Sequence, residues 1–272
     1  MQNQQQIHTR VKTLLYKLTG ITLAENKDIM IVNRLEKLLR NTKFNGDINL
    51  LLNKIEKENE FVTEFINTFT TNKTHFFREE FHFEDLKNRV LKNQKNINVY
   101  CCAASTGEEP YSIAMTTKEA SRNINAHVIA TDIDTQVLQY AANGIYRYQK
   151  SSKEFPSWIK PQKYFKRRVK KNLGADEVLI KVNDDLKDIV TFAQMNLNDN
   201  SYPFEKEQFD VIFCRNVLIY FSLEDQNIIL KKLFLHLKIG GTIYIGHSES
   251  PQDLINYVDK LGQNIFVKTR NI

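Results

Sequence analysis

The 272-residue sequence is poor in several residue types, and each shortage excludes a class of protein. It has three cysteines, of which Cys101 and Cys102 are adjacent, so neither a disulfide framework nor a cysteine-rich metal site is expected. Five prolines and nine glycines exclude a collagen-like or low-complexity chain. Residues 1–10 are polar, and no apolar run approaches the roughly 20 residues that span a bilayer. We therefore expect a cytoplasmic globular protein without membrane insertion and without a bound metal.

Positive charge is in excess and unevenly distributed. The formal net charge is +6, and residues 1–43 alone contain eight Lys or Arg against three Asp or Glu. A second basic run, KYFKRRVKK, spans residues 163–171. Both runs fit an ordinary solvated surface, and both fit equally well a surface that binds an acidic partner, either nucleic acid or a protein rich in Asp and Glu. Charge alone does not distinguish these alternatives.

Two kinds of hydrophobic pattern divide the chain. Up to about residue 90, apolar residues recur at helical spacing, for example Leu14, Leu15 and Leu18. Beyond that point, short apolar segments alternate with helical ones, which is typical of strands buried on both faces of a parallel sheet. The apolar segments are INVYCCAA, HVIAT, DIVTFAQM, FDVIFC and GTIYIG, and helices are expected from about Thr135 to Gly144 and from Leu223 to Leu237. The pattern predicts an α/β fold with a doubly wound sheet, an N-terminal all-α domain and a small β insertion at about residues 146–187.

Acidic residues follow the first two predicted strands. Ligands of an open parallel sheet bind beyond the carboxyl ends of its strands, so these positions are candidates for a site. Glu108 and Glu109, after Gly107, stand where a dinucleotide-binding loop has glycines, and carboxylates there would repel phosphate but accept an ammonium group. Asp132 ends the second strand, where an acid commonly holds ribose hydroxyls by charge-assisted hydrogen bonds. Each acid could instead merely cap or stabilise the start of a helix.

Polar residues also follow two later strands. Asn196 comes after DIVTFAQM, and Arg215 and Asn216 come after FDVIFC. An Asn side chain donates and accepts hydrogen bonds at once, so it is suited to the edge of an adenine. Any one of these residues could belong to an ordinary turn, but four strand ends with suitable polar groups at one edge of a sheet indicate a binding site. The predicted ligand combines a nucleoside with an amino-acid group.

Five stretches make the chain resemble a known family. They occur in family order between about residues 70 and 250: TTNKTHFFREE, CAASTGEEPYSIAM, ATDIDTQVL followed by GIY, FDVIFCRNVLIYF, and GGTIYIGHSES. The chain resembles the CheR family, the chemoreceptor glutamate methyltransferases of bacterial chemotaxis. The resemblance implies an S-adenosylmethionine-dependent methyltransferase with a Rossmann-like sheet. We expect a basic helical domain at residues 1–70, a linker at 71–90 that contributes to the cofactor site, and the methyltransferase domain at 91–272.

The resemblance also implies roles for individual residues. Arg78 would meet the methionine carboxylate or the substrate carboxylate, and Tyr220 would line the methyl-transfer site, so these two are the predicted catalytic residues. Of the adjacent Glu108 and Glu109, one would face the methionine end; the choice stays open, with Glu108 preferred. His247 and the cysteines are expected to be structural. The implied cofactor-binding residues are Asn72, Thr74, Arg78, Glu108, Asp132, Asn196, Leu197, Arg215 and Asn216.

The implied reaction transfers methyl from S-adenosylmethionine to glutamate carboxylates of chemoreceptor cytoplasmic domains, giving methyl esters and S-adenosylhomocysteine. Because a glutamate is already ionised at neutral pH, no general base is required. We expect the basic N-terminal helices, with Arg34, Lys37 and Arg40, to bind the acidic receptor helical bundle, and we expect a monomer. Some family members dock to a receptor pentapeptide through a glycine-rich loop. The corresponding region here, RRVKKNLGADEVLIKV, has one glycine, Gly174, so tethering of that kind is not expected.

Two other functions stay open at this point. A nucleic-acid methyltransferase would agree with a sequence pI of about 9.0 and with the KYFKRRVKK run. The [DN]-P-P-[YF] motif and the Pro-Cys nucleophile of DNA methyltransferases are missing, however, so no nucleic-acid partner is expected. A non-catalytic module could bind S-adenosylmethionine and regulate a partner by docking. The presence of Arg78, Asp132 and Tyr220 argues against that alternative.

Overall fold

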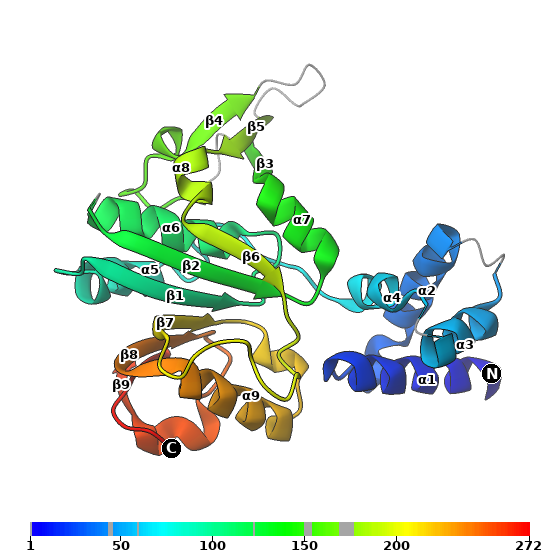
Figure 1. The fold of residues 1–272 in the computed structure, drawn as a ribbon. Coiled ribbons are helices and arrows are strands. Elements are labelled where there is room, and N and C mark those ends of the chain that lie inside the picture. Colours follow the sequence, from blue (N-terminus) through cyan, green and yellow to red (C-terminus); the bar gives the residue numbers. More distant parts are fainter. Residues whose placement is uncertain (1, 43–45, 59, 122, 150–153, 169–176) are drawn as a thin grey trace.

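The computed structural model describes residues 2–42, 46–58, 60–121, 123–149, 154–168 and 177–272. Its ribbon has two parts, a group of N-terminal helices and a larger α/β part (Figure 1). The N-terminal helices are α1 (Gln2–Thr19), α2 (Asp28–Thr42), α3 (Ile48–Glu58) and α4 (Val62–Phe69).

The N-terminal helices pack around a core of their own. Leu15 of α1, Ile31 of α2, Leu51 of α3 and Phe65 of α4 have no exposed surface. Each belongs to a set of apolar residues spaced three or four apart, so one face of each helix is buried against the others. The helical periodicity predicted for this region is therefore confirmed up to Phe69.

A mixed sheet, with seven strands among the described residues, forms the centre of the α/β part. Its order is β6-β2-β1-β7-β8-β10-β9; the first five strands are parallel, and β10 is antiparallel to both of its neighbours. The chain builds from β1 to β2 and β6 on one side and then to β7 and β8 on the other. This reversal between β1 and β7 leaves a crevice at the carboxyl ends of the strands. The bounds are β1 (Asn96–Cys102), β2 (Asn125–Asp132), β6 (Val190–Gln194), β7 (Phe209–Cys214), β8 (Leu237–Ile245), β9 (Val258–Gly262) and β10 (Ile265–Lys268).

Strand β1 is buried on both faces. Val99 and Cys101 lie in the core that also contains residues of α6, whereas Tyr100 and Cys102 lie in the core that contains residues of α9. The fold class, the buried central strands and the core position of the cysteines are thus as predicted. The helices of this part are α5 (Phe81–Asp85), α6 (Glu108–Ala120), α7 (Thr135–Asn143), α8 (Asp184–Lys187) and α9 (Leu223–His236).

A second, antiparallel sheet interrupts the alternation of strands and helices. Among the described residues it has β5 (Glu177–Val182) between β3 (Ile145–Gln149) and β4 (Phe165–Arg168). It projects from the α/β part beyond α7 (Figure 1). Residues 169–171 of the second basic run, and Gly174, on which the expectation about pentapeptide tethering rests, lie outside the described residues.

Two segments differ from the sequence prediction. Residues 70–80 are not helical, because they cross from the N-terminal helices to the α/β part and make their hydrogen bonds there. The C-terminal pair β9 and β10 was not predicted. Its strands are short, and β10 is fixed by pairing with β8, where Ile265 lies opposite Tyr244. Periodicity within so short a segment does not reveal such a distant partner.

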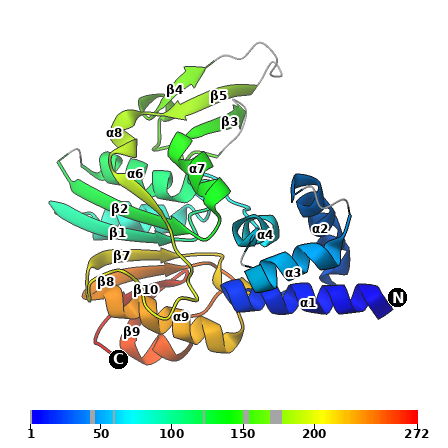
Figure 2. The same ribbon diagram turned by 45° about the vertical axis from the view of Figure 1, so that its right-hand side comes forward.

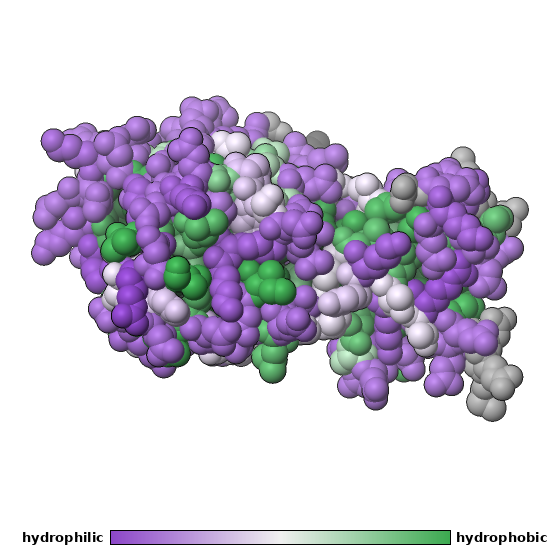
Figure 3. Space-filling view, turned by 60° about the horizontal axis from the view of Figure 1, so that its bottom comes forward, coloured by the Kyte–Doolittle hydropathy of each residue, from purple (hydrophilic) through white to green (hydrophobic). Residues whose placement is uncertain are grey.

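The N-terminal helices lie against the α/β part, with α1 near α9 and α4 near α7 (Figure 2). Tyr16 of α1 donates to Asp225 of α9 at 3.2 Å, and Asn67 of α4 exchanges hydrogen bonds of 3.0 and 3.1 Å with Thr135 at the start of α7. On the face shown in Figure 3, apolar side chains lie singly or in small groups among polar ones. No helix in the described ranges combines the length and apolarity that crossing a membrane requires.

Candidate active site

A cavity of about 480 Å³ lies where the carboxyl ends of the parallel strands meet the N-terminal helices. Parallel strands end at the same edge of a sheet, so residues far apart in the sequence converge there. The predicted residues on its lining are Asn72, Thr74, Arg78, Asp132, Asn196, Leu197, Arg215, Asn216 and Tyr220.

Asp132 ends β2 and is 7% exposed. Its carboxylate accepts the N–H of Ser105 at 2.8 Å and the N–H of Asp134 at 2.9 Å. Burial raises the pKa of Asp132, and these hydrogen bonds oppose the shift. A carboxylate oxygen can accept more than one hydrogen bond, so Asp132 can also accept a ligand hydroxyl. The alternative role of helix cap belongs to Asp134, whose Oδ1 accepts from the backbone of Gln136 at 2.9 Å and of Val137 at 3.2 Å.

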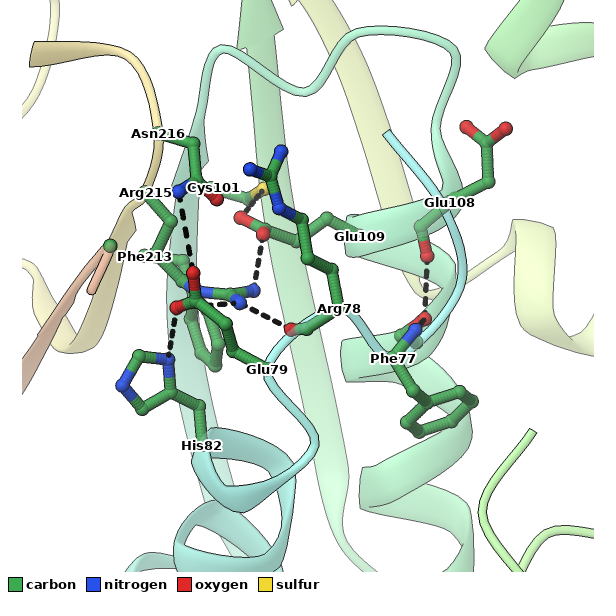
Figure 4. Close-up of polar contacts among 12 residues, drawn as sticks. Phe77, Arg78, Glu79, His82, Cys101, Glu108, Glu109, Phe213, Arg215 and Asn216 are labelled. Carbon is green, nitrogen blue, oxygen red and sulfur yellow. Dashed lines mark hydrogen bonds and ion pairs between the residues drawn. The ribbon is translucent and has the colours of Figure 1, made fainter. Parts of the chain in front are cut away.

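Glu109, and not Glu108, lies on the cavity lining. Figure 4 shows Glu109 directed toward Arg215, whereas Glu108 points away from this group. The Glu108 carboxylate instead accepts the hydroxyl of Thr106 at 2.6 Å. Successive residues of a helix project about 100° apart, so only one of two adjacent acids faces the cavity. The preferred residue, Glu108, thus lies off the lining, and we propose Glu109 for the methionine end instead. Burial raises the pKa of both carboxyls.

Arg215 follows β7, and its side chain is completely buried. Its Nη1 donates to Glu109 at 2.5 Å, and its Nη2 lies 3.2 Å from Glu79 and donates to the backbone carbonyl of Arg78 (Figure 4). The guanidinium also lies 5.5 Å from the ring centre of Phe83. Each terminal nitrogen therefore has at least one protein partner, whereas the buried Nε has no hydrogen-bond partner among the described residues. Arg215 lies on the lining, and its main contacts hold Glu109 and the linker in place.

Glu79 belongs to the same cluster and was not among the predicted residues. Its side chain is 10% exposed, and it contacts Arg215 at 3.2 Å, His247 Nδ1 at 2.8 Å and Asn216 Nδ2 at 3.3 Å. Burial opposes ionisation, but the Arg215 charge and the hydrogen bonds from His247 and Asn216 outweigh it and lower the pKa of Glu79 to about 2. The acids of FFREE were the available signal, but the sequence does not tell which of them turns inward. His247, which was expected to be structural, contacts this cluster through Glu79.

The linker before α5 reaches the cavity from a second side. Asn72 Nδ2 donates to Asp134 Oδ2 at 2.8 Å, which holds the linker against the end of β2. Arg78 lies on the lining and donates to the Lys73 carbonyl at 3.2 Å. A guanidinium has five N–H groups, so Arg78 retains donors for a ligand carboxylate.

Asn196 follows β6, and both ends of its amide are already engaged. Its Nδ2 donates to the Leu18 carbonyl of α1 at 2.9 Å, and its Oδ1 accepts the N–H of Asn198 at 2.9 Å. One N–H and one lone pair are left to read an adenine edge. Leu197 is buried and supplies apolar surface beside it.

The N-terminal helices complete the cavity, which sequence reasoning did not anticipate. Thr22 donates two hydrogen bonds to the backbone carbonyl of Tyr220, one from its N–H at 2.8 Å and one from its hydroxyl at 3.1 Å. No motif marks these residues, because their position depends on how the two parts pack. The lining residues from this region are Thr19, Ile21, Thr22, Leu23, Ala24, Lys27 and Met30.

The lining fits S-adenosylmethionine. With this cofactor bound, Asp132 would offer acceptors to the ribose hydroxyls, Glu109 would offer negative charge to the amino group, and Arg78 would offer donors to the carboxylate of the methionine moiety. Ile133 and Met195 add apolar surface. Within the part of the chain that the structure describes, no group of three or more His, Cys, Asp or Glu side chains could hold a metal ion. A site of this kind at the carboxyl edge of a doubly wound sheet places the chain in the class of S-adenosylmethionine-dependent methyltransferases.

Comparison with known proteins gives the family. Residues 72–267 match "CheR methyltransferase, SAM binding domain", and residues 9–70 match "CheR methyltransferase, all-alpha domain". The chain is 38% identical to the chemotaxis protein methyltransferase of Escherichia coli (strain K12), over 96% of this chain and 90% of that protein. It is 35% identical to chemotaxis protein methyltransferase 2 of Pseudomonas aeruginosa, over 97% and 95%, and 36% identical to the chemotaxis protein methyltransferase of Borreliella burgdorferi, over 89% and 87%. The chain belongs to the CheR methyltransferase family, as its motifs predicted.

Proposed function

We propose that this enzyme transfers the methyl group of S-adenosylmethionine to glutamate side chains of chemoreceptor cytoplasmic domains, forming methyl esters and S-adenosylhomocysteine. The relatives are named chemotaxis protein methyltransferases, which supports a receptor substrate. The observation that carries the proposal is a partly buried cation whose Nη1 atom is itself buried and has a spare donor. Arg34 Nη1 has no hydrogen-bond partner among the described residues. A substrate carboxylate is a suitable partner for such a group.

Arg34 lies on α2, next to the cavity. Its Nη2 donates to the hydroxyl of Thr71 at 3.2 Å, and its guanidinium is 6.0 Å from the ring centre of Phe69; both of these neighbours line the cavity. Burial lowers the pKa of Arg34, and the nearby Tyr220 opposes the shift. Through Thr71 and Phe69, Arg34 lies beside the cavity whose wall includes Tyr220, and in this proposal it helps to hold a substrate carboxylate there.

The proposed reaction needs little proton transfer by the enzyme. S-adenosylmethionine supplies a methyl group on a sulfonium sulfur, and its transfer forms a carbon–oxygen bond, breaks the carbon–sulfur bond and leaves a neutral thioether. A glutamate has a pKa of about 4.3, so the substrate is ionised at neutral pH and no base is needed. The substrate carboxylate must lose its hydration water, and its attacking oxygen must be held in line with the methyl carbon and the sulfur. In this proposal Arg78, Arg34 and Tyr220 do this, and positioning of this kind can supply about 7–11 kcal/mol.

We place the receptor-binding surface on α2. Lys37 and Arg40 are exposed there, three residues apart and beyond Arg34 on the same helix. Cationic side chains on a helix face attract an acidic helical bundle and raise the rate of encounter. One copy of the enzyme suffices for this docking, so the proposal takes the protein as a monomer.

Substituting the exposed pair, Lys37→Gln with Arg40→Gln, is expected to raise the KM for a receptor fragment by about 10-fold at low salt and by less at high salt, because screening weakens the attraction in both proteins. Affinity for S-adenosylmethionine should not change. Adding Arg34→Gln is expected to lower kcat as well. Initial rates measured at two ionic strengths check this. The matched control is Lys206→Gln with Arg270→Gln, which changes exposed cations elsewhere. Unchanged methylation at low salt would refute the docking role.

The reaction itself is tested by the stability of the transferred label. The enzyme is incubated with methyl-labelled S-adenosylmethionine and a receptor cytoplasmic fragment, and the labelled fragment is treated with mild alkali. We expect incorporation that depends on the fragment and is released by base, because esters hydrolyse whereas N-methyl groups persist. Base-stable label, label transferred to RNA instead, or no transfer at all would contradict the proposal. The last two results would favour a nucleic-acid methyltransferase and a binding module respectively.

A further inference from the structure

A buried carboxylate holds the loop after β7 from behind. Glu249 lies in the turn after β8 and is 9% exposed. One of its oxygens accepts the N–H of Leu218 at 2.7 Å, and the other accepts the N–H groups of Asn216 and Gly246 at 2.8 Å each. Three backbone donors from two loops thus converge on one side chain. Hydrogen bonds from N–H groups to an ionised carboxylate are stronger than those to a neutral acceptor.

The turn that carries Glu249 is itself fixed. Asn264 Nδ2 donates to the carbonyls of Gly246 and Glu249 at 2.8 and 3.0 Å, and the N–H of Glu249 donates to the Gly246 carbonyl at 2.9 Å. Position 246 requires glycine, because a Cβ there would lie 2.5 Å from the Glu249 carboxylate and 2.7 Å from the Asn216 nitrogen. The turn that carries the Glu249 carboxylate is therefore fixed by contacts of its own, in addition to those with the loop after β7.

The loop in question forms part of the cavity wall. Asn216 and Tyr220, at its two ends, both line the cavity. Asn216 has a φ of 57°, in the left-handed region that costs energy for a residue with a side chain. Leu218, between them, is completely buried, so its N–H would be unpaired without Glu249. The loop conformation that presents Tyr220 thus depends on this acceptor.

We propose that Glu249 is a positioning residue for methyl transfer, which holds residues 216–220 so that Tyr220 keeps its place on the cavity wall. Glu249 is not among the lining residues, so it acts through the loop and not on the substrate. The proposal rests on the role given to Tyr220 under the proposed function. The proposal gives a role to Glu249, the glutamate of the GHSES motif, for which the sequence alone suggested none.

The test is Glu249→Gln in the full-length enzyme. The amide keeps one acceptor oxygen and turns an NH2 group toward backbone donors, so at least one of the three hydrogen bonds is lost. With cofactor and receptor fragment saturating, kcat is expected to fall by about 10-fold or more, while the Kd for S-adenosylmethionine changes by less than about 3-fold. Amide hydrogen exchange at Asn216 and Leu218 should become faster. Glu205→Gln, at an exposed position, is the control and should change none of these values.

A double-mutant cycle separates positioning from simple destabilisation. If Glu249 acts through Tyr220, then Glu249→Gln should cost less than about 3-fold in a Tyr220→Phe background, because the hydroxyl that it positions is already gone. An equal loss of kcat in both backgrounds, or unchanged kcat with unchanged exchange, would overturn the proposal. Full activity of Tyr220→Phe alone would overturn it as well. Base-labile labelling of the receptor by the unaltered enzyme would still stand, so the proposed function fails or succeeds separately.

Discussion

Asp132→Asn is expected to weaken binding of S-adenosylmethionine by roughly 30- to 150-fold. Asp132 is the buried acceptor on the cavity lining at the end of β2, and we place the two ribose hydroxyls on it. A hydrogen bond to a charged group contributes about 1.5–3 kcal/mol, against about 0.5–1.5 kcal/mol for a neutral one. Losing the charge at two bonds therefore costs about 2–3 kcal/mol, which corresponds to the stated change in Kd. Titration calorimetry with S-adenosylmethionine and S-adenosylhomocysteine measures it.

The matched control is Asp210→Asn. Asp210 also accepts a backbone N–H, from Asn98 at 2.8 Å, but it lies near the start of β7, at the opposite edge of the sheet. Its substitution removes the same charge and weakens a comparable hydrogen bond together with an ion pair to Lys238 at 2.5 Å, and cofactor affinity should stay within about 2-fold of the original value. If Asp132→Asn bound the cofactor as tightly as Asp210→Asn does, the ribose assignment would be wrong.

Arg215→Met is expected to cost about 3–5 kcal/mol of folding free energy at pH 7. Its guanidinium is completely buried between two carboxylates, Glu79 at 3.2 Å and Glu109 at 2.5 Å. Removing one partner of a buried ion pair leaves uncompensated charge in the interior, and this is the source of the cost. Against a typical total stability of about 5–15 kcal/mol the loss is severe. Urea unfolding followed by circular dichroism measures it.

The same variant should change how stability depends on pH. In the unaltered protein the pKa of Glu79 is lowered from an ordinary value near 4.5 to about 2. Its stabilising contribution is therefore complete above about pH 4.5 and is lost as the pH falls toward 2. Without the Arg215 charge, only the hydrogen bonds from His247 and Asn216 oppose burial, so the pKa of Glu79 rises and its ionised form stabilises the fold less at neutral pH. The difference between the two proteins should be largest near pH 7 and shrink on acidification.

Arg89→Met provides the comparison at a solvated ion pair. Arg89 contacts Asp85 at 2.5 Å, but its side chain is 37% exposed. Exposed pairs contribute about 0–1 kcal/mol, so this variant should lose less than about 1 kcal/mol. Equal losses of folding free energy in Arg215→Met and Arg89→Met would show that burial of the Arg215 cluster does not increase its contribution to stability.

Much of the fold could be predicted because burial imposes a pattern on nearby residues. A strand segment covered on both faces, such as residues 99–102 of β1, must be apolar, and α7 ends at Gly144, whose φ of 61° suits glycine. The same logic located the site, since Asp132, Asn196 and Arg215 all follow parallel strands. The β9–β10 pair escaped prediction because pairing with β8, and not its own sequence pattern, stabilises it.

The details of the site could not be predicted in the same way. Two adjacent acids such as Glu108 and Glu109 look alike in the sequence, and only the direction of α6 places Glu109 on the cavity. The roles of Glu79 and Thr22 were invisible because their partners, Arg215 and Tyr220, are remote in the chain.

By itself, the sequence determined the α/β class, the family and the edge of the sheet at which the cavity lies, because each of these follows from local periodicity and from short motifs. The tertiary structure decided which groups line that cavity. The Thr22 hydroxyl meets the Tyr220 carbonyl across 198 residues of chain, and Arg215 meets the Arg78 carbonyl across 137. Contacts of this separation are fixed by the packing of whole elements against one another, and no local pattern records that packing.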